Sequence, residues 1–545
     1  MLKELVYAAL IVFVMLTSES ANSGCFLILD GIWLNGLKNV KEKAFSIQMM
    51  INSAEDGDTI YVPSGTYIEN IKINNSVKLI ANGTVEVTPI NPIDNVVEIS
   101  KNNVTLTGFT IINPKGTHGI FAKGVTNYKI FGNRVLGGYF GLVINNSRNG
   151  IIAENEVLGC TFGIYFRESF ENTVIQNSVE LSKYGITFSL CFNSTIIGNN
   201  IANCTYGLYN HISDRNTISE NVFQENAMGA SIIRSRENLI LLNEFLSNFY
   251  GIIFDDAYRN VASKNNVSGG LIGIKVQGSR NITISENVAR FSTNNVAIES
   301  SFNVTVSSNK LEYAKGHAVT IYETSGGTVS WNSVSSCRVG ISVENCRLLK
   351  VENNLVEQNA YGLYLFRSSK TLLTYNRCFN NTIADFYSEG SENSIVKNLE
   401  MSSYRDGKEV SFTYEGDISI RGAMSVELEI EEALSGFFNI TLLSPGALKV
   451  NITYDPVDLR DAQREPVFYL WTGEDWRPVR GSVIEESPSK GLASFLLTDS
   501  GIYVLGAGEK PEQSPMVIPV AVFLVLLISS YSALRALKRR KQASG

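Results

Sequence analysis

A fixed spacing of 22 residues between recurring glycines constrains this chain more than any other feature. An asparagine recurs with the same step, eight residues before the glycine that follows it. A unit of 22 residues cannot bury its own apolar side chains, so successive units must stack on one another to form a core. The glycines that keep this step are Gly119, Gly141, Gly163, Gly185, Gly207, Gly229, Gly251 and Gly273, and after one step of 23 residues it resumes at Gly340 and Gly362.

Apolar residues alternate with other residues inside each unit, which indicates strands. Ile164 and Phe166 lie two residues apart, as do Ile252 and Phe254, so every second side chain should point inward. Ile and Val dominate and no helical segment intervenes, which predicts an all-β parallel β-helix with coils stacked at ~4.8 Å. The leucine-rich repeat has a similar period, but its L-x-x-L-x-L-x-x-N pattern is missing from the sequence.

The recurring asparagine is interpreted as a structural ladder and is given no functional role. Asn tolerates the αL backbone conformation in a turn, and its side chain can hydrogen-bond with the Asn one coil above and one coil below. The recurring glycine is expected at a second corner, where a side chain would collide. The predicted ladder comprises Asn133, Asn155, Asn177, Asn199, Asn221, Asn243, Asn265, Asn287, Asn309, Asn332, Asn354, Asn376 and Asn398.

The entrance to the repeat carries a second pattern. Residues 44–54 (AFSIQMMINSA) indicate an amphipathic helix that covers the open end of the core. The segment GDTIYVPSGTY at residues 57–67, followed by ENI at 69–71 and VKLI at 77–80, resembles the start of right-handed parallel β-helix proteins of the pectin-lyase-like superfamily, especially the CASH and NosD-type groups. This resemblance covers about residues 40–400. It is specific for fold and poor for function, because these groups include hydrolases, lyases, epimerases and non-enzymes.

The two ends of the chain predict an exported protein with one membrane anchor. Residues 1–23 have the charged start, apolar run and small residues of a signal peptide, with an uncleaved N-terminal anchor as the alternative. Residues 515–534 carry no charge and could cross a bilayer as a helix, and the basic tail at 535–545 would lie in the cytoplasm. The other predicted divisions are a cap segment at 24–55, the β-helix at 56–400, a β domain at 401–505 and a linker at 506–514.

The β domain at 401–505 shows strand-like alternation between polar turns. It loosely resembles the membrane-proximal domain that precedes the anchor in many archaeal surface proteins. Its aromatic residues around Trp471 and Trp476 are interpreted as core packing of a small sandwich, with a sugar platform as the alternative.

Cysteines and glycosylation sequons fit an exported chain. The coil spacing places most cysteines too far apart for disulfides, so they are interpreted as small core residues, with Cys337 and Cys346 as the favoured pair. Candidate N-glycosylation sites are Asn74, Asn82, Asn103, Asn145, Asn193, Asn203, Asn266, Asn281, Asn303, Asn380, Asn439 and Asn451.

The residue four positions after the repeat glycine should point outward, and this column supplies the candidate site residues. Asp255 and Glu299 fall two coils apart, ~9.6 Å, which suits the two carboxylates of an inverting glycosidase and equally suits a solvated surface. Beside them, Arg234 and Asp256 are interpreted as a surface ion pair. The column also contains the candidate binding residues Arg167, His211 and Gln277, and it places Ile321 as the neighbour of Glu299.

The sequence contains only weak motifs for catalysis or metal binding. The Asn-Thr-Asp, Gly-His-Gly and Arg-x-Lys elements that the pectin-lyase resemblance implies for hydrolases are missing, and Gly316-His317 is followed by Ala318. The NosD-type resemblance implies copper handling, which needs clustered imidazole or sulfur ligands. The histidines fall several coils apart, so no metal site and no cofactor are predicted; they are His118, His211 and His317.

These observations favour a surface protein over an enzyme. The net charge of −7 and the 18% of charged residues argue against a nucleic-acid binder, which needs clustered Lys and Arg. We therefore predict a single-pass cell-membrane protein with an extracellular β-helix, non-catalytic, that binds glycans or other envelope components. The alternatives are a membrane-tethered polysaccharide hydrolase or lyase using Asp255 and Glu299, and a NosD-like accessory protein for an exported metalloenzyme or transporter.

Overall fold

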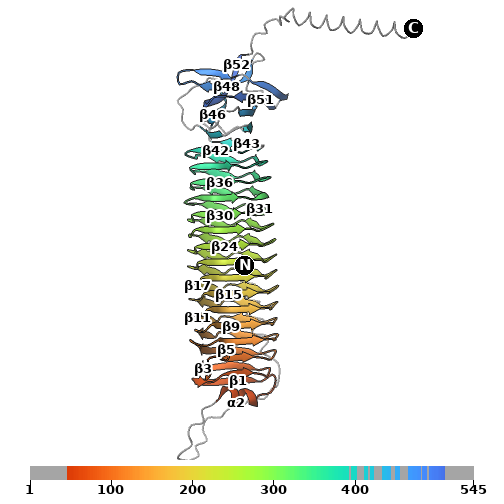
Figure 1. Cartoon of the computed structure of the whole chain (residues 1–545), viewed down its shortest axis with the longest axis vertical. Coiled ribbons are helices and arrows are strands. Elements are labelled where there is room, and N and C mark those ends of the chain that lie inside the picture. The colour runs from red at the N-terminus through yellow and green to blue at the C-terminus, as the bar shows by residue number, and fades with distance from the viewer. Residues whose placement is uncertain are drawn as a thin grey trace, which may run out of the picture.

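The repeat folds into a straight right-handed parallel β-helix of 15 turns, seen as the long column in Figure 1. The computed structural model describes residues 46–509, apart from 392–393, 402–409, 415–417, 423–432, 443–447, 455–458, 460–463, 480 and 488–489. The helix α2 (Ile47–Ser53) lies at one end of the column, and a group of antiparallel strands lies at the other.

Each regular coil contains one strand of six residues and two of three residues. In one coil these are β12 (Phe162–Arg167), β13 (Thr173–Ile175) and β14 (Ser178–Glu180), and each pairs in parallel with the strand 22 residues later. The longest strands stack into one sheet, here called the long-strand sheet. It comprises β2 (Ile71–Ile73), β4 (Val97–Ile99), β6 (His118–Lys123), β9 (Phe140–Asn145), β12, β15 (Tyr184–Ser189), β18 (Tyr206–His211), β21 (Met228–Ile233), β24 (Tyr250–Asp255), β27 (Ile272–Gln277), β30 (Asn294–Glu299), β33 (His317–Tyr322), β36 (Val339–Glu344), β39 (Tyr361–Phe366) and β42 (Ala384–Glu389).

The core is a continuous apolar stack, as the alternation predicts. Ile164 and Phe166 have no exposed surface, and their column neighbours Ile186 and Phe188 are equally buried. The repeat glycine lies inside the long strand at its second residue, so the expectation that it marks a corner is wrong. The predicted collision does occur, because a Cβ on Gly163 would lie 2.6 Å from the carbonyl oxygen of Gly185.

The asparagine ladder forms inside the column. Asn155 is typical: its backbone N and its Nδ2 both donate to Oδ1 of Asn177 at 2.9 Å. Its Nδ2 also donates to the carbonyl oxygens of Ile130 and Ala153. The same pattern runs from Asn133 to Asn376, whereas the side chain of Asn398 lies outside the described residues.

The αL conformation expected of the ladder asparagines belongs instead to the residue before each of them. Glu154 has a φ of 52° and Gln176 one of 54°. This kink turns the next side chain inward, where the buried amide must find partners in the adjacent coils. Each regular coil contains four such kinks, and each is followed by an inward residue, so four internal columns exist where the sequence indicated one.

The cysteines are explained by these extra columns. Cys191 occupies a position held by Ser169 and Ser213 in the neighbouring coils, and its thiol donates to the carbonyl oxygen of Ser189 as a serine would. Cys337 and Cys346 stand in two different columns, so their favoured pairing is wrong. Six cysteines of the described region are buried and free, namely Cys160, Cys191, Cys204, Cys337, Cys346 and Cys378, while Cys25 lies outside that region.

Burial makes these thiols poor nucleophiles. Desolvation raises the pKa of Cys191 to about 12 and that of Cys346 to about 11. Their thiolates would be unstable in the apolar interior, so we assign them a packing role only.

The extra residue of the 23-residue step lies in the turn before β33. As a result Glu299 pairs with Tyr322, and Ile321 points into the core with 2% exposure. The placement of Ile321 in the outward column is therefore wrong, because the insertion falls before the strand and shifts the count by one.

The first coil is closed by helix α2. The side chain of Ser46 accepts from the backbone N of Met49, and the carboxylate of Glu69 accepts from the backbone N of Ile47 and Gln48 at 2.9 and 3.0 Å. A carboxylate at a helix N-terminus satisfies otherwise unpaired N–H groups and complements the helix dipole. Ile47 and Ile51 then cover the end of the core.

The other end of the column is closed by antiparallel pairing. The strand β45 (Ile418–Gly422) pairs with β42 of the last coil, and β44 (Val410–Tyr414) pairs with β43 (Ile395–Met401). These antiparallel strands end the parallel stack by covering the edges of the last coil. The group continues with β46 (Ala433–Leu442), β47 (Leu448–Tyr454), β48 (Arg464–Trp471), β49 (Trp476–Val479), β50 (Ser482–Ser487), β51 (Lys490–Leu497) and β52 (Gly501–Glu509).

The predicted signal peptide at 1–23 and the predicted span at 515–534 lie outside the described residues. Within residues 46–509, no helix combines the length and apolar character that a membrane crossing requires.

Candidate functional site

The candidate carboxylates occupy adjacent positions of the long-strand sheet. Asp255, Gln277 and Glu299 follow one another in register on β24, β27 and β30, as the coil count predicts. Glu299 is engaged by the Nζ of Lys275 at 3.2 Å. The amide of Gln277 separates the two carboxylates, and Lys275 occupies the space beside one of them. This arrangement resembles a solvated polar surface more than a pair converging on one bond.

The neighbouring ion pair predicted from sequence is confirmed. Arg234 Nε lies 3.5 Å from Asp256 Oδ2, and both side chains are more than 60% exposed. Water screens such a pair, so it contributes under ~1 kcal/mol to stability.

The candidate binding residues Arg167 and His211 lie on the same sheet, but they do not join the carboxylates. Arg167 is paired with the adjacent Glu168 at 3.2 Å. His211 stacks on Tyr209 with 5.9 Å between ring centroids, and burial lowers its imidazole pKa.

A column of stacked aromatic rings, here called the ring column, runs up the first half of the long-strand sheet. The ring of His118 stacks on that of Phe140 at 5.1 Å, and the stack continues through one ring per coil. Tyr184 lies 4.6 Å from Phe162 and 4.9 Å from Tyr206, with interplanar angles of 6° and 8°. In such a stack both faces of each internal ring are covered by the adjacent rings. The column therefore stabilises coil register and offers mainly ring edges to a ligand.

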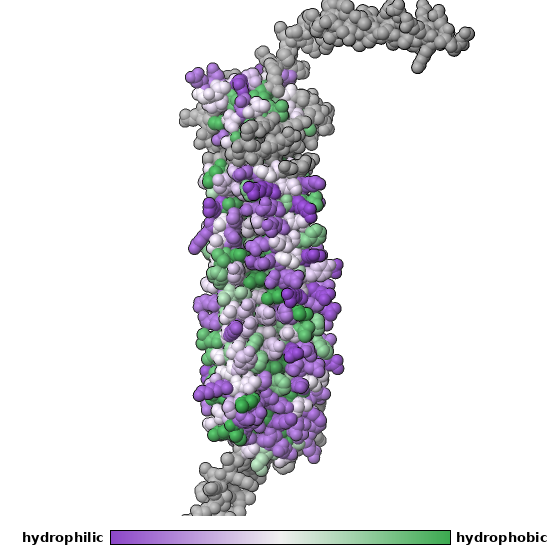
Figure 2. Space-filling view, in the orientation of Figure 1, coloured by the Kyte–Doolittle hydropathy of each residue, from purple (hydrophilic) through white to green (hydrophobic). Residues whose placement is uncertain are grey.

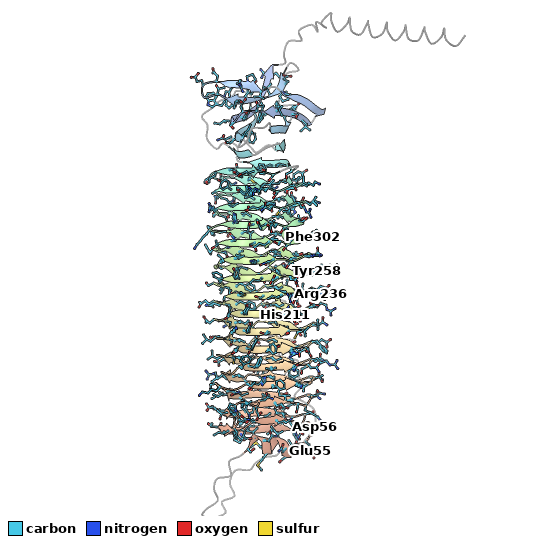
Figure 3. The ribbon with its side chains drawn as sticks, viewed as in Figure 1. Glu55, Asp56, His211, Arg236, Tyr258 and Phe302 are labelled. Carbon is cyan, nitrogen blue, oxygen red and sulfur yellow. The ribbon has the colours of Figure 1, made fainter. Side chains whose placement is uncertain are left out.

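A different column of aromatic and basic side chains, here called the edge stripe, runs along the turn after each long strand. Its residues are linked from coil to coil by isolated parallel bridges. The central members Arg236, Tyr258 and Phe302 lie one above another along one side of the column in Figure 3, away from His211. The stripe comprises Arg148, Phe170, Phe192, Asp214, Arg236, Tyr258, Arg280, Phe302, Ser325 and Arg347.

The local backbone explains why the stripe projects outward. In one turn, Asp256 and Arg259 are both in the αL conformation, with φ of 50° and 54°. Between them Ala257 points inward with 2% exposure, so Tyr258 must point outward. The two kinks are repeated in each regular coil and align these outward side chains at the coil spacing of ~4.8 Å.

Two aromatic members of the stripe leave much of their surface to solvent, whereas Phe170 and Phe192 are half-buried. Phe302 is 52% exposed and Tyr258 is 36% exposed. The guanidinium of Arg259 lies 4.8 Å from the centroid of the Tyr258 ring, and Arg148 lies 5.9 Å from that of Phe170. Flat rings flanked by guanidinium groups can pack against apolar faces of a ligand while binding its anionic groups.

Charge along the stripe opposes that of the whole chain. The stripe and the αL residue after each member contain six arginines between residues 148 and 347, against three carboxylates, although the chain carries a net charge of −7. One carboxylate, Asp214, is 2.9 Å from Arg236. Figure 2 shows polar and apolar side chains interspersed over the visible face of the β-helix. The six arginines are Arg148, Arg215, Arg236, Arg259, Arg280 and Arg347, and the carboxylates are Glu171, Asp214 and Glu237.

The sequence analysis missed this stripe, although a signal for it was present. Its members stand seven residues after the repeat glycine, as Tyr258 does after Gly251. Strand alternation predicts outward positions only within or directly beside the strands, such as those four and five residues after the glycine. The stripe lies in a turn whose geometry depends on two αL residues that in most coils are not glycine.

The described residues do not provide a copper site. His118, His211 and His317 lie on β6, β18 and β33, and the buried thiols already donate to backbone carbonyls or pack in the core. Within residues 46–509, no three His, Cys, Asp or Glu side chains converge to hold a metal ion. A soft metal would need such a cluster.

Most of the candidate glycosylation asparagines lie at the surface. Two of them, Asn145 and Asn281, are half-buried, and the side chain of Asn451 lies outside the described residues. The exposed ones are Asn74, Asn82, Asn103, Asn193, Asn203, Asn266, Asn303, Asn380 and Asn439.

Two protein families match consecutive parts of the chain. Residues 51–250 match the family described as periplasmic copper-binding protein (NosD), and residues 250–400 match the right handed beta helix region. A cell surface glycoprotein of Methanothermus fervidus is 36% identical over 83 residues, which are 15% of this chain and 14% of that glycoprotein. The chain thus aligns with only a small part of that relative.

Two solved structures are similar to the chain at low identity and with TM-scores below 0.5. The tailspike protein of E. coli bacteriophage HK620, in complex with a pentasaccharide, has a TM-score of 0.41 and 9% identity, covering 85% of this chain and 88% of its own. The periplasmic alginate epimerase AlgG has a TM-score of 0.32 and 14% identity, covering 62% and 83%. Identities this low concern the fold alone. With its 22-residue coils and internal asparagine ladder, the chain is a right-handed parallel β-helix protein, and its residues 51–250 are similar to the NosD family.

Proposed function

We propose that this chain is a non-catalytic surface protein that binds an acidic polysaccharide along its edge stripe. The observation that carries the proposal is a run of four coils in which arginines alternate with exposed rings, namely Arg236, Tyr258, Arg280 and Phe302. A saccharide chain presents apolar C–H faces that pack on aromatic rings, and its carboxylate or sulfate groups match the guanidinium fork.

The periodicity of the stripe supports a polymer as the ligand. Arg236 and Arg280 lie two coils apart, ~9.6 Å, with the ring of Tyr258 between them. This is on the order of the disaccharide repeat of an extended polysaccharide, so successive acidic groups on one side of the chain could meet successive arginines. A column of identical spacing would bind a polymer cooperatively and a single sugar weakly.

A surface location fits this role. The matched relative is a cell surface glycoprotein, and the NosD family is periplasmic. The strand β52 ends at Glu509, six residues before the predicted span at 515–534. If that span anchors the chain, the β-helix projects from the membrane with helix α2 at its far end.

The test is binding of the full-length chain in lipid nanodiscs to matched acidic and neutral polysaccharides. We expect polyuronate or sulfated chains to bind and neutral chains of equal length to bind at least tenfold more weakly. The double variant Y258S/R280S should lose at least tenfold in affinity for the acidic chain. A matched control, Y184S, changes an aromatic residue of the ring column and should retain binding. Equal binding of acidic and neutral chains, or by the stripe variant, would refute the proposal.

Single-stranded nucleic acid is the other polymer with alternating charge and flat groups. Binding of an oligonucleotide in preference to the acidic polysaccharide would also overturn the assignment.

The enzymatic alternative is tested with the same material. Reducing ends or unsaturated products, formed by the wild-type chain and lost in D255N, would establish a hydrolase or lyase at Asp255 and Glu299. Copper bound in stoichiometric amount by the folded chain would instead favour the accessory role.

A further inference from the structure

A small pocket opens at the end of the β-helix that carries helix α2. It has a volume of about 250 Å³ and is formed by β2, β4, the start of β6 and the loop before β4. This volume lies just below the ~300–1,000 Å³ of sites for drug-sized ligands, so the pocket suits one sugar-sized group. Its lining residues are Asn70, Ile71, Lys72, Ile93, Asp94, Asn95, Glu98 and His118.

The pocket contains His118, the ring at one end of the ring column. His118 is the first ring, and one of its faces is covered by Phe140 of the following coil, with an interplanar angle of 9°. The other lining residues come from the preceding coils and the loop between them. The second face of the imidazole is turned toward the preceding coil, where Asn95 stands in register with His118 and lines the pocket with it. The ring of Phe121 lies beside the imidazole, with 5.1 Å between centroids and an interplanar angle of 47°. Burial lowers the pKa of His118, so the ring is neutral at pH 7.

Polar groups surround this ring face and are held in place. Lys72 Nζ lies 3.2 Å from Glu98 Oε1, and Asn95 Nδ2 donates to Glu98 Oε2 at 3.2 Å. Asn70 braces the loop, because its Nδ2 donates to the carbonyl oxygens of residues 91 and 95. The pocket thus presents ammonium, carboxylate and amide groups whose positions are fixed before a ligand arrives.

The loop over the pocket is tied down at two further points. Asn91 Nδ2 donates to Asp94 Oδ2 at 2.8 Å, and its backbone N donates to Asn70 Oδ1. Thr117 Oγ1, next to His118, donates to the carbonyl oxygen of Ile93. A preformed loop loses little conformational entropy on binding, which favours recognition of a small ligand.

We infer that this pocket is a second binding site, separate from the edge stripe, and that it takes one uncharged or amino sugar at the end of a saccharide chain. The C–H face of a pyranose packs on the part of the imidazole that lines the pocket. Neighbouring sugar hydroxyls each donate to one group and accept from another, which the pairs Glu98 with Lys72 and Asp94 with Asn95 provide. A sugar inside the chain would extend at both ends, and a pocket of this size at the end of the column suits a terminal residue.

Charge separates this site from the edge stripe. Asp94 and Glu98 outnumber Lys72, so the pocket carries one excess negative charge and should repel a uronate. The stripe has an excess of arginines and should attract one. The two sites therefore select opposite classes of sugar, and loss of either leaves the other testable.

The experiment uses the full-length chain in nanodiscs, titrated by calorimetry and by saturation-transfer NMR with glucose, N-acetylglucosamine, glucosamine and glucuronate. We expect a neutral or amino sugar to bind at least tenfold more tightly than glucuronate. H118A should weaken this binding at least tenfold, and E98Q at least threefold. H118F restores a ring face and should bind within about threefold of the wild type.

Two controls keep the result interpretable. H211A removes a half-buried histidine outside the pocket and should leave sugar binding unchanged, and circular dichroism establishes that each variant is folded. The double variant Y258S/R280S should also bind the monosaccharide normally, even if it has lost the acidic polymer. Equal binding by H118A, preference for glucuronate, or binding of Ca²⁺ with no sugar binding would overturn the inference.

Discussion

The ring column and the edge stripe are built from the same repeat and the same kinds of residue, yet they use aromatic rings in opposite ways. In the ring column, Tyr184 is stacked between Phe162 and Tyr206, at 4.6 and 4.9 Å. In the edge stripe, Phe170 is followed by Phe192, but Tyr258 is followed one coil later by an arginine and Phe302 by a serine, so no continuous stack of rings runs along it. The spacing of the coils is common to both, so the difference comes from which residue follows in the next coil.

This difference separates stability from recognition. A stack of rings at one per coil satisfies every internal ring face and fixes register, as the asparagine ladder does inside the column. Alternation with arginine breaks the stack and leaves apolar faces and cations in contact with water. In a solenoid, a column of like residues therefore indicates a structural role, and a column of unlike residues indicates a surface that can bind.

Loss of an asparagine from the internal ladder should lower stability more than loss of a residue from either outer column. In N221A the carbonyl oxygens of Ile196 and Ser219 lose the Nδ2 donor, and Asn199 loses its acceptor. Leaving several buried polar groups unpaired should lower the free energy of unfolding by about 3 kcal/mol or more. Chemical denaturation of N221A and of N200A, an exposed asparagine of the preceding coil, measures the difference. Similar stabilities would remove the structural role of the ladder.

Loss of a ring from the ring column should have the second-largest effect on stability. This prediction tests the comparison between the two columns most directly. Y184A removes a ring stacked on both sides and should lower the free energy of unfolding by about 2 kcal/mol, from lost burial and stacking. Y258A removes a ring with no such stack and should cost under about 1 kcal/mol. Denaturation midpoints of the two variants, made in one background, test this order. A reversed order would mean that the stripe is structural and the ring column is not.

Much of the fold was predictable because the 22-residue period of glycine and asparagine is visible in the sequence. Gly163 and Asn155 are visible as members of their columns without any structure, since both must keep register over many coils. Two details were not predictable. The αL kink falls on residues such as Glu154 or Gln176, whose side chains do not signal it, because tertiary stacking overrides the intrinsic preference. The column shift at Tyr322 depends on where within its coil the extra residue is placed.

The candidate sites were less predictable for a related physical reason. Alternation correctly placed Asp255, Gln277 and Glu299 side by side, because strand geometry is regular. It said nothing of Lys275, which engages Glu299 from the neighbouring position. The pocket at His118 depends on the loop at 89–95, which belongs to no repeat. Regular columns can be counted from the sequence, whereas irregular loops and side-chain pairing cannot.

Binding by the edge stripe should have an electrostatic component and an aromatic component, and only the first should depend on salt. The expected changes are smaller than those of stability. R280Q removes a charge and should lower affinity for an acidic polysaccharide about threefold to tenfold, and it should flatten the dependence of affinity on salt. Y258L removes the aromatic face but no charge, so affinity should fall by a similar factor while the salt dependence stays unchanged. Affinity measured between about 50 and about 300 mM salt resolves the two, because the Debye length falls roughly twofold over this range. Parallel loss of slope in both variants would contradict this division.

The smallest effect concerns His118, which belongs to the ring column and yet lines the pocket. Burial lowers its pKa below the ordinary value near 6.5, because the charged imidazolium is desolvated between Phe140 and the pocket. Since the unfolded chain binds this proton more readily, the histidine's contribution to stability is complete above pH 6.5 and is lost as the pH falls through the folded-state pKa. Part of the loss of thermal stability between pH 7.5 and pH 5 should therefore disappear in H118F. H211F gives the matched control, because His211 also has a lowered pKa but lies on β18, away from the pocket.

Sugar binding should weaken over the same pH range in the wild type and stay constant in H118F, since an imidazolium beside the C–H face is hydrated more strongly than the neutral ring. A pH dependence of sugar binding that survives in H118F would assign it to the pocket carboxylates instead.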